Sequence, residues 1–354
     1  MEGTLLGKPL PGTWIWTTRP GAEGDLVAEF EAHLGAGSSQ SVGPALVRSN
    51  GAPTRRHGGI ELTFGRTGFR LLRTLELEAG KASPSELDEA VRALRDAVGH
   101  VSTFALDAWV PDHDATNPLT HRLAHLEASF LERLEQQVPV LAAKRVALAE
   151  LAERGGMLVH LCLAGERVAY LGLVRSSDCA TFAPGGRARM HVAGERPSRA
   201  ARKVEEALNW LGTGPGPEEL CVDLGAAPGG WSWRLLLRGA RVIAVDPARL
   251  SPQLLAERRL RHAQQSAFDF TPDEPVDWLF CDMAWRPLEA AQLLAKWGRR
   301  RWARLLVANI KLPMKRKVDM VHEVRTLLAT AGWKDLRTRQ LYHDRDEITL
   351  VGHL

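Results

Sequence analysis

Short apolar runs alternate with longer amphipathic segments throughout the second half of the chain. The apolar runs predict strands at residues 220–224, 241–245, 277–281, 305–310, 336–341 and 347–351. Between them, apolar residues three and four positions apart predict helices at residues 199–211, from residue 230, and near 252–263, 287–303 and 315–331. This order predicts an α/β domain over residues 191–354, with a mostly parallel, doubly wound sheet.

The first half of the chain mixes both periods. Alternating apolar and polar residues predict strands at 13–17, 60–64, 69–73, 104–109, 158–162 and 168–174. The helical period predicts helices at 23–34, from residue 83 onward, and in one long stretch over 118–153. We therefore expect a small α+β module over residues 1–80 and a second module over residues 81–190, ahead of the α/β domain.

Composition is that of an ordinary globular protein, with 45% hydrophobic and 25% charged residues. No window holds the roughly 18 uncharged apolar residues of a membrane helix, and the start of the chain carries no secretory signal. The four cysteines form no CxxC pair and the histidines form no HExxH motif, so no metal site is expected. We expect a cytoplasmic protein with reduced thiols and no membrane partner.

The net charge of +4 is unevenly distributed. Residues 196–354 hold 26 Lys and Arg against 19 Asp and Glu, whereas residues 1–195 hold 20 against 23. A positive field over the second half favours a polyanionic partner such as nucleic acid. Solvated surface arginines would give the same count, so charge alone leaves both interpretations open.

The strongest local signal is a glycine-rich turn after the strand predicted at 220–224. Asp223 lies at the end of that strand, and Gly225, Gly229 and Gly230 allow a tight turn into the next helix. Ligands of such sheets bind at the carboxyl ends of the strands. Asp246 follows the next strand, where a carboxylate can accept hydrogen bonds from both hydroxyls of a ribose. The turn therefore predicts a ligand that contains a ribose.

Two common nucleotide-binding motifs do not match this turn. The dinucleotide motif is G-x-G-x-x-G, whereas these glycines are spaced G-x-x-x-G-G, and the Gly-Lys-Ser/Thr of a P-loop is missing. The turn instead resembles the S-adenosylmethionine loop of methyltransferases, specifically the FtsJ-type ribose 2′-O-methyltransferases. A glycine turn that only packs the core is the alternative.

Four charged residues at the ends of separate predicted elements could serve methyl transfer to a ribose hydroxyl: Lys203, Asp282, Lys311 and Glu347. A free lysine, with a pKa of about 10.4, is a poor base at pH 7. We expect Lys311 to be the general base, with its pKa lowered by Lys203 and by partial burial. Asp282 and Glu347 would orient it. Taken singly, each of the four would be interpreted as an ordinary surface charge.

Methylation of a base fits the same region less well. Enzymes that methylate exocyclic amines carry Asn/Asp-Pro-Pro-Tyr/Phe after the fourth strand, where this chain has Asp282-Met283-Ala284-Trp285. Enzymes that methylate cytosine carbon need a nucleophilic cysteine, whereas Cys281 belongs to an apolar strand. Ribose methylation is therefore the favoured chemistry.

Four motifs together resemble those of one family. They are residues 223–232 (DLGAAPGGWS), 281–283 (CDM), 311–315 (KLPMK) and 340–347 (QLYHDRDE). In these the chain is similar to the RlmM family, the bacterial 23S rRNA cytidine 2′-O-ribose methyltransferases. The resemblance extends over nearly the whole chain and is specific in the second half.

The resemblance implies a ferredoxin-like module at 1–80, a THUMP RNA-binding module at 81–190 and a Rossmann-like methyltransferase domain at 191–354. It also implies S-adenosyl-L-methionine as methyl donor and a tetrad of the four charged residues above. The family has a serine where Ala200 stands, so that cofactor contact is either lost or supplied by Ser198. The family's adenine-side aspartate falls at Ser266, with Asp269 three residues further on. The expected cofactor contacts are Ser198, Asp223, Gly225, Ala227, Pro228, Gly229, Gly230, Trp231, Asp246, Ser266 and Asp282.

The expected partner is 23S rRNA or its assembly intermediate, bound by a monomer. Two alternatives stay open. One is a non-catalytic RNA-binding or ribosome-assembly factor that keeps the cofactor fold, and the other is a ribose methyltransferase that acts on another RNA. Trp231 and Trp285 could each stack on a base or pack in the core.

Overall fold

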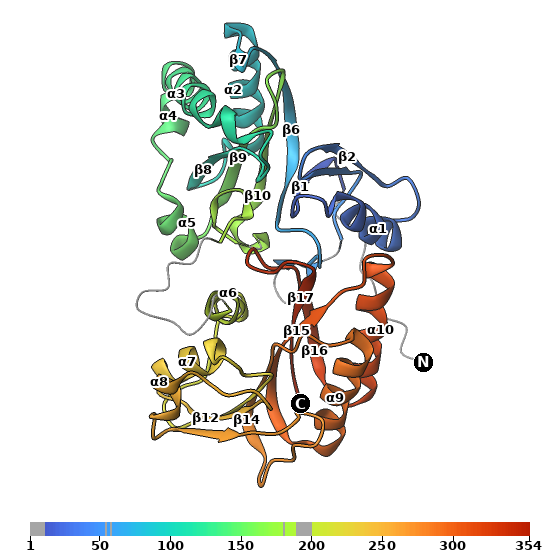
Figure 1. The fold of residues 1–354 in the computed structure, drawn as a ribbon. Coiled ribbons are helices and arrows are strands. Elements are labelled where there is room, and N and C mark those ends of the chain that lie inside the picture. The colour runs from blue at the N-terminus through green and yellow to red at the C-terminus, as the bar shows by residue number, and fades with distance from the viewer. Residues whose placement is uncertain (1–10, 54, 57–58, 180, 189–199) are drawn as a thin grey trace. The chain divides into compact units, whose positions relative to one another are not determined.

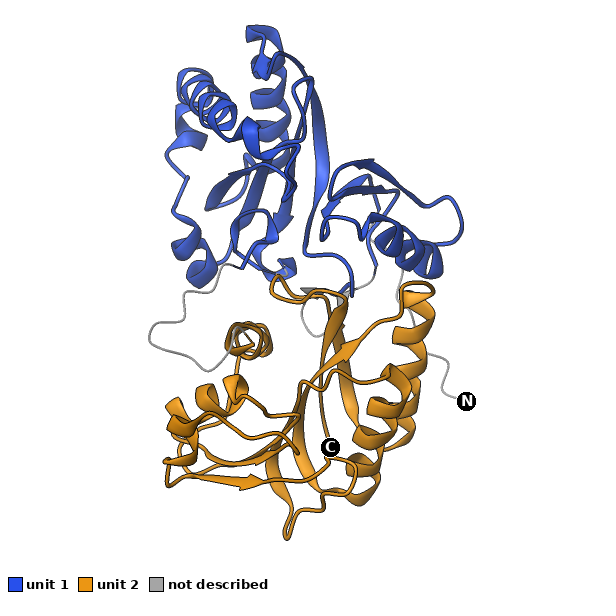
Figure 2. Ribbon diagram, viewed as in Figure 1, with its two compact units in different colours: residues 1–188 blue, residues 189–354 orange. Residues whose placement is uncertain are grey.

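The chain forms two compact units, residues 1–188 and 189–354, which Figure 2 colours separately. The computed structural model describes residues 11–53, 55–56, 59–179, 181–188 and 200–354. Each unit has its own sheet and its own buried core. The division of the chain into modules at 1–80, 81–190 and 191–354 stays a prediction.

Unit 2 is built on a seven-stranded sheet with the order β13-β12-β11-β14-β15-β17-β16. Its elements are α6 (Ala201–Leu211), β11 (Leu220–Leu224), α7 (Gly230–Leu237), β12 (Arg241–Val245), α8 (Pro252–Leu255), β13 (Leu260–Ala263), β14 (Val276–Cys281), α9 (Pro287–Arg300), β15 (Ala303–Lys311), α10 (Lys317–Thr330), β16 (Lys334–Arg339) and β17 (Glu347–His353). The five neighbouring strands β13, β12, β11, β14 and β15 are parallel to one another. β17 runs antiparallel to both β15 and β16. Helices α6 and α7 lie on one side of the sheet and α9 and α10 on the other (Figure 1).

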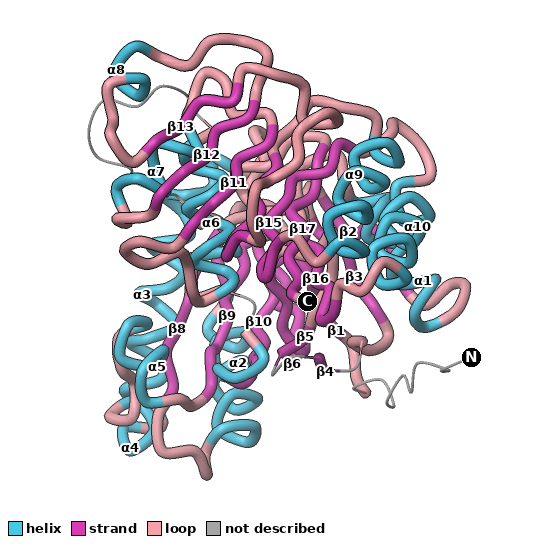
Figure 3. The backbone as a smooth tube through the Cα atoms, turned by 90° about the horizontal axis from the view of Figure 1, so that it is seen from below, coloured by secondary structure: helices cyan, strands magenta, loops and turns pink. Residues whose placement is uncertain are grey.

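The central strands are apolar because both faces of a parallel sheet are covered. In β11, Cys221, Val222 and Leu224 are completely buried, and β12 and β14 are nearly as apolar. Figure 3 shows β13, β12 and β11 side by side, so their carboxyl ends open onto one edge. The predicted α/β, Rossmann-like sheet in the second half of the chain is confirmed.

The helix predicted near 252–263 is wrong. Helix α8 ends at Leu255, and residues 260–263 form the edge strand β13, which pairs with β12. The segment is rich in good helix formers, including Glu257 and Arg258. The open edge of β12 supplies backbone partners that outweigh this local preference.

Unit 1 has an eight-stranded sheet. Seven of its strands have the order β2-β3-β1-β6-β10-β9-β8, and the eighth, β7, pairs with β6. Its elements are β1 (Trp14–Thr17), α1 (Glu23–Leu34), β2 (Ser39–Gly43), β3 (Leu46–Ser49), β4 (Arg55–Arg56), β5 (Gly59–Ile60), β6 (Thr67–Glu78), β7 (Lys81–Ala82), α2 (Pro84–Val98), β8 (Phe104–Trp109), η1 (Asn117–Leu119), α3 (Thr120–Gln137), α4 (Pro139–Ala142), α5 (Leu148–Arg154), β9 (Met157–Leu163), β10 (Val168–Arg175), η2 (Ser176–Asp178) and η3 (Pro184–Gly186). β6 pairs with β1 and β10, so one sheet runs through both segments expected as ferredoxin-like and THUMP modules. Those two names stay predictions.

Two predicted elements of unit 1 are wrong. The long helix over 118–153 is broken after Gln137, because Pro139 disfavours helical geometry at Val138, which has φ −139° and ψ 61°. The strand at 60–64 does not form beyond residue 60. There the backbone N–H groups of Thr63 and Phe64 donate to the buried Glu29 carboxylate of α1, at 2.6 and 2.9 Å. Strands β2 and β3 were not predicted.

Candidate active site

The glycine-rich turn between β11 and α7 lies at the carboxyl edge of the sheet. Gly225 and Gly229 have φ of +77° and +116°, in the left-handed region that favours glycine. A Cβ on Gly225 would lie 2.6 Å from Met283 Cγ, and one on Gly229 would lie 1.9 Å from Leu254 Cδ1. Both positions therefore need glycine, for backbone conformation and for close packing against the segments after β14 and β12.

Asp223 is the buried acid next to this turn. Ser232 of α7 donates from Oγ to Asp223 Oδ2 at 2.6 Å, whereas Oδ1 has no hydrogen-bond partner among the described residues. Burial raises the pKa of Asp223 to about 7, in spite of the hydrogen bond from Ser232. A buried oxygen without a partner is costly. The free Oδ1 of Asp223 is therefore suited to accept a hydrogen bond from a polar ligand at this edge.

Asp246, after β12, ties its strand to the glycine turn. Its Oδ2 accepts a hydrogen bond from Ala227 N at 3.0 Å, and its Oδ1 accepts one from Ala248 N at 2.8 Å. A carboxylate oxygen can accept a second bond. Asp246 can therefore fix the turn and still bind the hydroxyls of a ribose.

The other predicted cofactor residues differ in what they can contribute. Ser266, after β13, accepts a hydrogen bond on Oγ from Phe268 N at 3.2 Å. The Trp231 indole is only 2% exposed and makes a T-shaped contact with Phe280, with ring centroids 6.0 Å apart. Trp231 thus packs in the core, and its buried Nε1 has no hydrogen-bond partner among the described residues. Ser198 lies outside the described residues.

Three of the four predicted catalytic residues form one charge cluster. Lys203 Nζ, on α6, lies 3.4 Å from Asp282 Oδ1 and 2.5 Å from Glu347 Oε1. Asp282 follows β14 and Glu347 is the first residue of β17. Burial by itself lowers the pKa of Lys203, but the charges of the two acids outweigh it, so the pKa is raised. Burial raises the pKa of Asp282, and Lys203 acts against that rise.

Lys311 lies beside this cluster on the neighbouring strand. It is the last residue of β15, and its Cα is paired with that of Glu347. Directly opposed residues of an antiparallel pair project to the same face, so these two side chains share one face of the sheet. Lys311 is exposed and makes no ion pair with any residue that the structure describes. The acids thus hold Lys203, and the partial burial expected for Lys311 is not observed.

Two residues that the sequence did not single out extend the cluster. Asn309 donates from Nδ2 to Asp282 Oδ1 at 3.2 Å, and Thr349 donates from Oγ1 to Asn309 Oδ1 at 2.9 Å. Asn309 and Thr349 are opposed in the ladder, as Lys311 and Glu347 are. The strand period of two, which puts Asn309 on the face of Lys311, is the signal that could have found it.

Glu206 links helix α6 to the loop before β17. Its Oε1 accepts from Tyr342 N at 2.7 Å, its Oε2 accepts from His343 N at 2.9 Å, and the ring Nδ1 of His343 lies 2.7 Å from Oε2. Glu206 is three residues after Lys203, so both lie on one face of α6. It therefore fixes the loop that leads into Glu347.

The edge of unit 2 thus combines a glycine turn, the acids Asp223 and Asp246 and a lysine–carboxylate cluster. In the described part of the chain, no group of three or more His, Cys, Asp or Glu residues is arranged to hold a metal ion. Among the described helices, none has the length and apolar character needed to cross a membrane.

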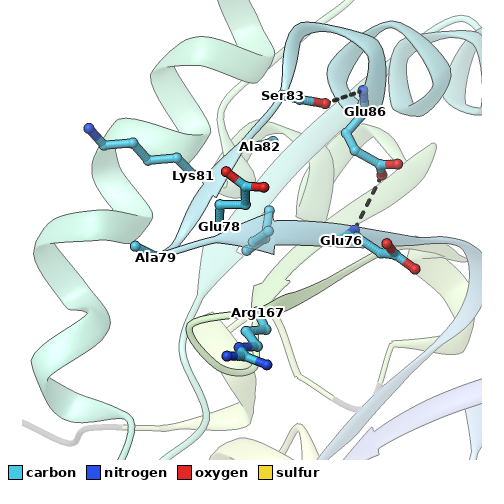
Figure 4. A pocket seen from close by; sticks show the side chains of 9 residues that line it. Glu76, Glu78, Ala79, Lys81, Ala82, Ser83, Glu86 and Arg167 are labelled. Atoms are coloured by element: carbon cyan, nitrogen blue, oxygen red, sulfur yellow. Dashed lines mark hydrogen bonds between the residues drawn. The ribbon is translucent and has the colours of Figure 1, made fainter.

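A cavity of about 780 Å³ lies in unit 1, and none of the predicted site residues lines it. Three of its lining residues are acidic and two are basic, a mixture that does not favour a polyanion. Its lining residues are Glu76, Leu77, Glu78, Ala79, Lys81, Ala82, Ser83, Glu86 and Arg167 (Figure 4). We assign it no function.

Comparisons with known proteins point to one kind of enzyme. The FtsJ-like methyltransferase family model matches residues 196–314, which include the glycine turn. The chain is 33% identical over 354 residues to "Ribosomal RNA large subunit methyltransferase M" of Halorhodospira halophila, with 96% of each chain covered. It is 40% identical over 261 residues to the protein of that name in Xylella fastidiosa, with 70% of each covered. With that of Alkalilimnicola ehrlichii it shares 34% over 358 residues, covering 96% of this chain and 94% of the relative.

Proposed function

The chain belongs to the ribosomal RNA large subunit methyltransferase M family, and from this premise we propose that it methylates the ribose 2′-hydroxyl of a cytidine in large-subunit rRNA. It is a methyltransferase that uses S-adenosylmethionine. The observation that carries the ribose assignment is the cluster of Lys203, Asp282 and Glu347 beside Lys311, at the edge that holds the glycine turn.

The residues at this edge fit the methyl donor. When bound, S-adenosylmethionine supplies a methyl group attached to a positively charged sulfur. Asp223, with its unpartnered Oδ1, and the backbone of residues 225–230 would hold its polar groups. Asp246 would accept hydrogen bonds from the ribose hydroxyls of the cofactor.

Lys311 is the proposed general base, which in its neutral form accepts the proton of the ribose hydroxyl at Nζ. The adjacent cluster has two carboxylates and one ammonium. Its net negative charge stabilises the ammonium that forms on Lys311 as the hydroxyl oxygen gains the methyl group.

Lys203 is the proposed positioning group for the ribose oxygen. An ammonium has three donors, and in Lys203 two of them face Asp282 and Glu347. The third remains for the substrate hydroxyl. Because the acids hold Lys203 in place, the oxygen can be aligned with the methyl group before it reacts.

The test uses large-subunit rRNA from cells that lack the protein, incubated with the purified enzyme and isotopically labelled S-adenosylmethionine. Mass spectrometry of the nucleosides is expected to show label in 2′-O-methylcytidine. Lys311→Ala should abolish the transfer but retain cofactor binding in calorimetry. Lys334→Ala, at an exposed lysine of β16, is the control that should keep full activity.

Each other outcome has a distinct meaning. Label in a base would contradict ribose chemistry, and label in another nucleoside would contradict the cytidine assignment. Full activity of Lys311→Ala would remove Lys311 from the mechanism. Absence of both cofactor binding and transfer in the wild-type protein would favour a ribosome-assembly factor.

A further inference from the structure

An exposed tryptophan lies beside the catalytic cluster, and the mechanism above does not use it. Trp285 is 48% exposed, whereas the other tryptophan that sequence analysis left open, Trp231, is 2% exposed. Most large apolar side chains of unit 2 are buried. The exposed part of the indole is therefore available for contact with a ligand.

The indole of Trp285 is held in a fixed orientation. Its Nε1 donates to Glu289 Oε2 at 2.7 Å, in the first turn of α9. Its ring lies against Phe268, with centroids 5.4 Å apart and an interplanar angle of 51°. Its backbone N–H donates to Met283 O at 2.8 Å in a tight turn. A ring restrained by two side-chain contacts, on a backbone held in a turn, loses little conformational entropy when it binds.

The position of Trp285 places it within reach of the substrate. It is three residues after Asp282, so the two Cα atoms are at most about 11 Å apart. Phe268, which the ring touches, follows Ser266 at the carboxyl end of β13. The aromatic pair thus lies along the same edge of the sheet as the proposed cofactor and ribose sites.

The surroundings favour RNA as the occupant. Arg286 is next to Trp285; its side chain is 84% exposed and forms an ion pair with Glu289 at 3.0 Å. Lys311, the last residue of β15, and Lys315, four residues further along the chain, are also exposed. Exposed cations beside an aromatic ring match a phosphate backbone with an unpaired base, because every base has a face that can stack.

We propose that Trp285, supported by Phe268, is a stacking platform for an unpaired base of the substrate RNA next to the methylated ribose. This inference rests on the proposed function for the identity of the RNA. It deepens that function, since it requires the target region to be single-stranded when it is bound.

The test compares Trp285→Ala and Trp285→Phe with the wild-type protein. Stacking on one base contributes about 1–3 kcal/mol, so Trp285→Ala should weaken binding of the unmodified rRNA about 5- to 150-fold. KM for the RNA should rise by a similar factor, while cofactor affinity in calorimetry stays unchanged. Trp285→Phe keeps a stacking face and should stay within about threefold of the wild type.

Leu237→Ala is the matched control, because Leu237 is also apolar and exposed, at 58%, but lies at the far end of α7. It should leave RNA binding unchanged. In competition experiments, a short single-stranded oligoribonucleotide should displace rRNA from the wild-type protein at a lower concentration than its annealed duplex does. With Trp285→Ala, the two competitors should be equally effective.

RNA binding by Trp285→Ala at the wild-type level would overturn the proposal, and so would a loss equal to that of Leu237→Ala. A loss of RNA binding that follows the thermal stability of the variants would also overturn it, since it would assign Trp285 a packing role. RNA binding is measured without turnover. A failure of the ribose assignment therefore shows in the nucleoside analysis and leaves this result interpretable.

Discussion

Replacing Lys203 by methionine should strongly destabilise the protein at neutral pH. Methionine keeps an unbranched apolar stem, but it leaves Asp282 and Glu347 without the cation that now lies 3.4 and 2.5 Å from their oxygens. The side chains of the two acids are only 17% and 9% exposed. Removing one partner of a buried ion pair costs about 3–5 kcal/mol. We expect a loss of that size in the free energy of unfolding.

The loss should depend on pH in a defined direction. Burial raises the pKa of Asp282 and Lys203 counteracts it, so in the variant this pKa rises further. A carboxyl whose pKa is higher in the folded than in the unfolded state stabilises the fold at low pH, and this contribution is lost as the pH rises through the folded value. Well below the unfolded value of about 3.9, Asp282 is protonated in both states. There the difference between the wild type and Lys203→Met should be small, and it should grow towards neutral pH.

Urea unfolding at a series of pH values measures this difference. Lys334→Met, at an exposed lysine, should change the free energy of unfolding by less than about 0.5 kcal/mol at every pH. A loss in Lys203→Met that is the same at pH 4 and pH 8 would refute the electrostatic reasoning. A variant as stable as the wild type would show that the two acids do not depend on Lys203.

Two further substitutions test neighbouring parts of the site. Glu206→Gln should lower the free energy of unfolding by about 2–4 kcal/mol, because an amide nitrogen cannot accept the bonds that the loop donates through Tyr342 N and its neighbour. The control is Glu205→Gln, which loses a part-buried ion pair with Arg234 and should lower the free energy of unfolding by about 1 kcal/mol. If thermal denaturation showed the same loss of stability for both variants, the role assigned to Glu206 would be contradicted. The pKa of Asp223 is about 7 in the folded protein, so wild-type stability should fall as the pH rises from about 4 to about 7. Asp223→Asn should remove that part of the decline in urea melts, and an unchanged slope would argue against a raised pKa.

The parts of the site predicted from sequence are those set by local order along the chain. The glycine turn and the acids after β11, β12 and β14 follow from an apolar strand and the residue that comes next. In a parallel sheet these carboxyl ends meet at one edge whatever the rest of the chain does. Asp223, Asp246 and Asp282 could therefore be found without coordinates.

The pairing within the charge cluster could not be predicted in the same way. The acids contact Lys203 because α6 packs beside α7 and brings its first turn to the edge of the sheet. Nothing in the local sequence distinguishes Lys203 from Lys311 as the partner of Glu347. Glu206 was missed for a similar reason, since it is one of several charges on an amphipathic helix. Its role depends on a loop distant in the chain.

Two elements were predicted wrongly because the prediction followed the local preference of their side chains. Residues 260–263 have helical composition and become a strand because β12 offers an unpaired edge. Residues 63 and 64 have strand composition, but their backbone groups are satisfied by Glu29. In both cases a tertiary partner for the backbone decided the outcome over the side-chain pattern.

β17 occupies an interior place in the sheet, between β15 and β16, although residues 347–353 make it the last strand in chain order. During synthesis, one edge of β15 is unpaired until β17 has left the ribosome. Until then Lys203 also lacks Glu347, one of its two acidic partners. A polypeptide that lacks residues 347–353 leaves the apolar edge of β15 unpaired and leaves Lys203 with Asp282 as its remaining acidic partner. Assembly of the charge cluster around Lys203 therefore requires residues that lie 144 positions apart in the chain.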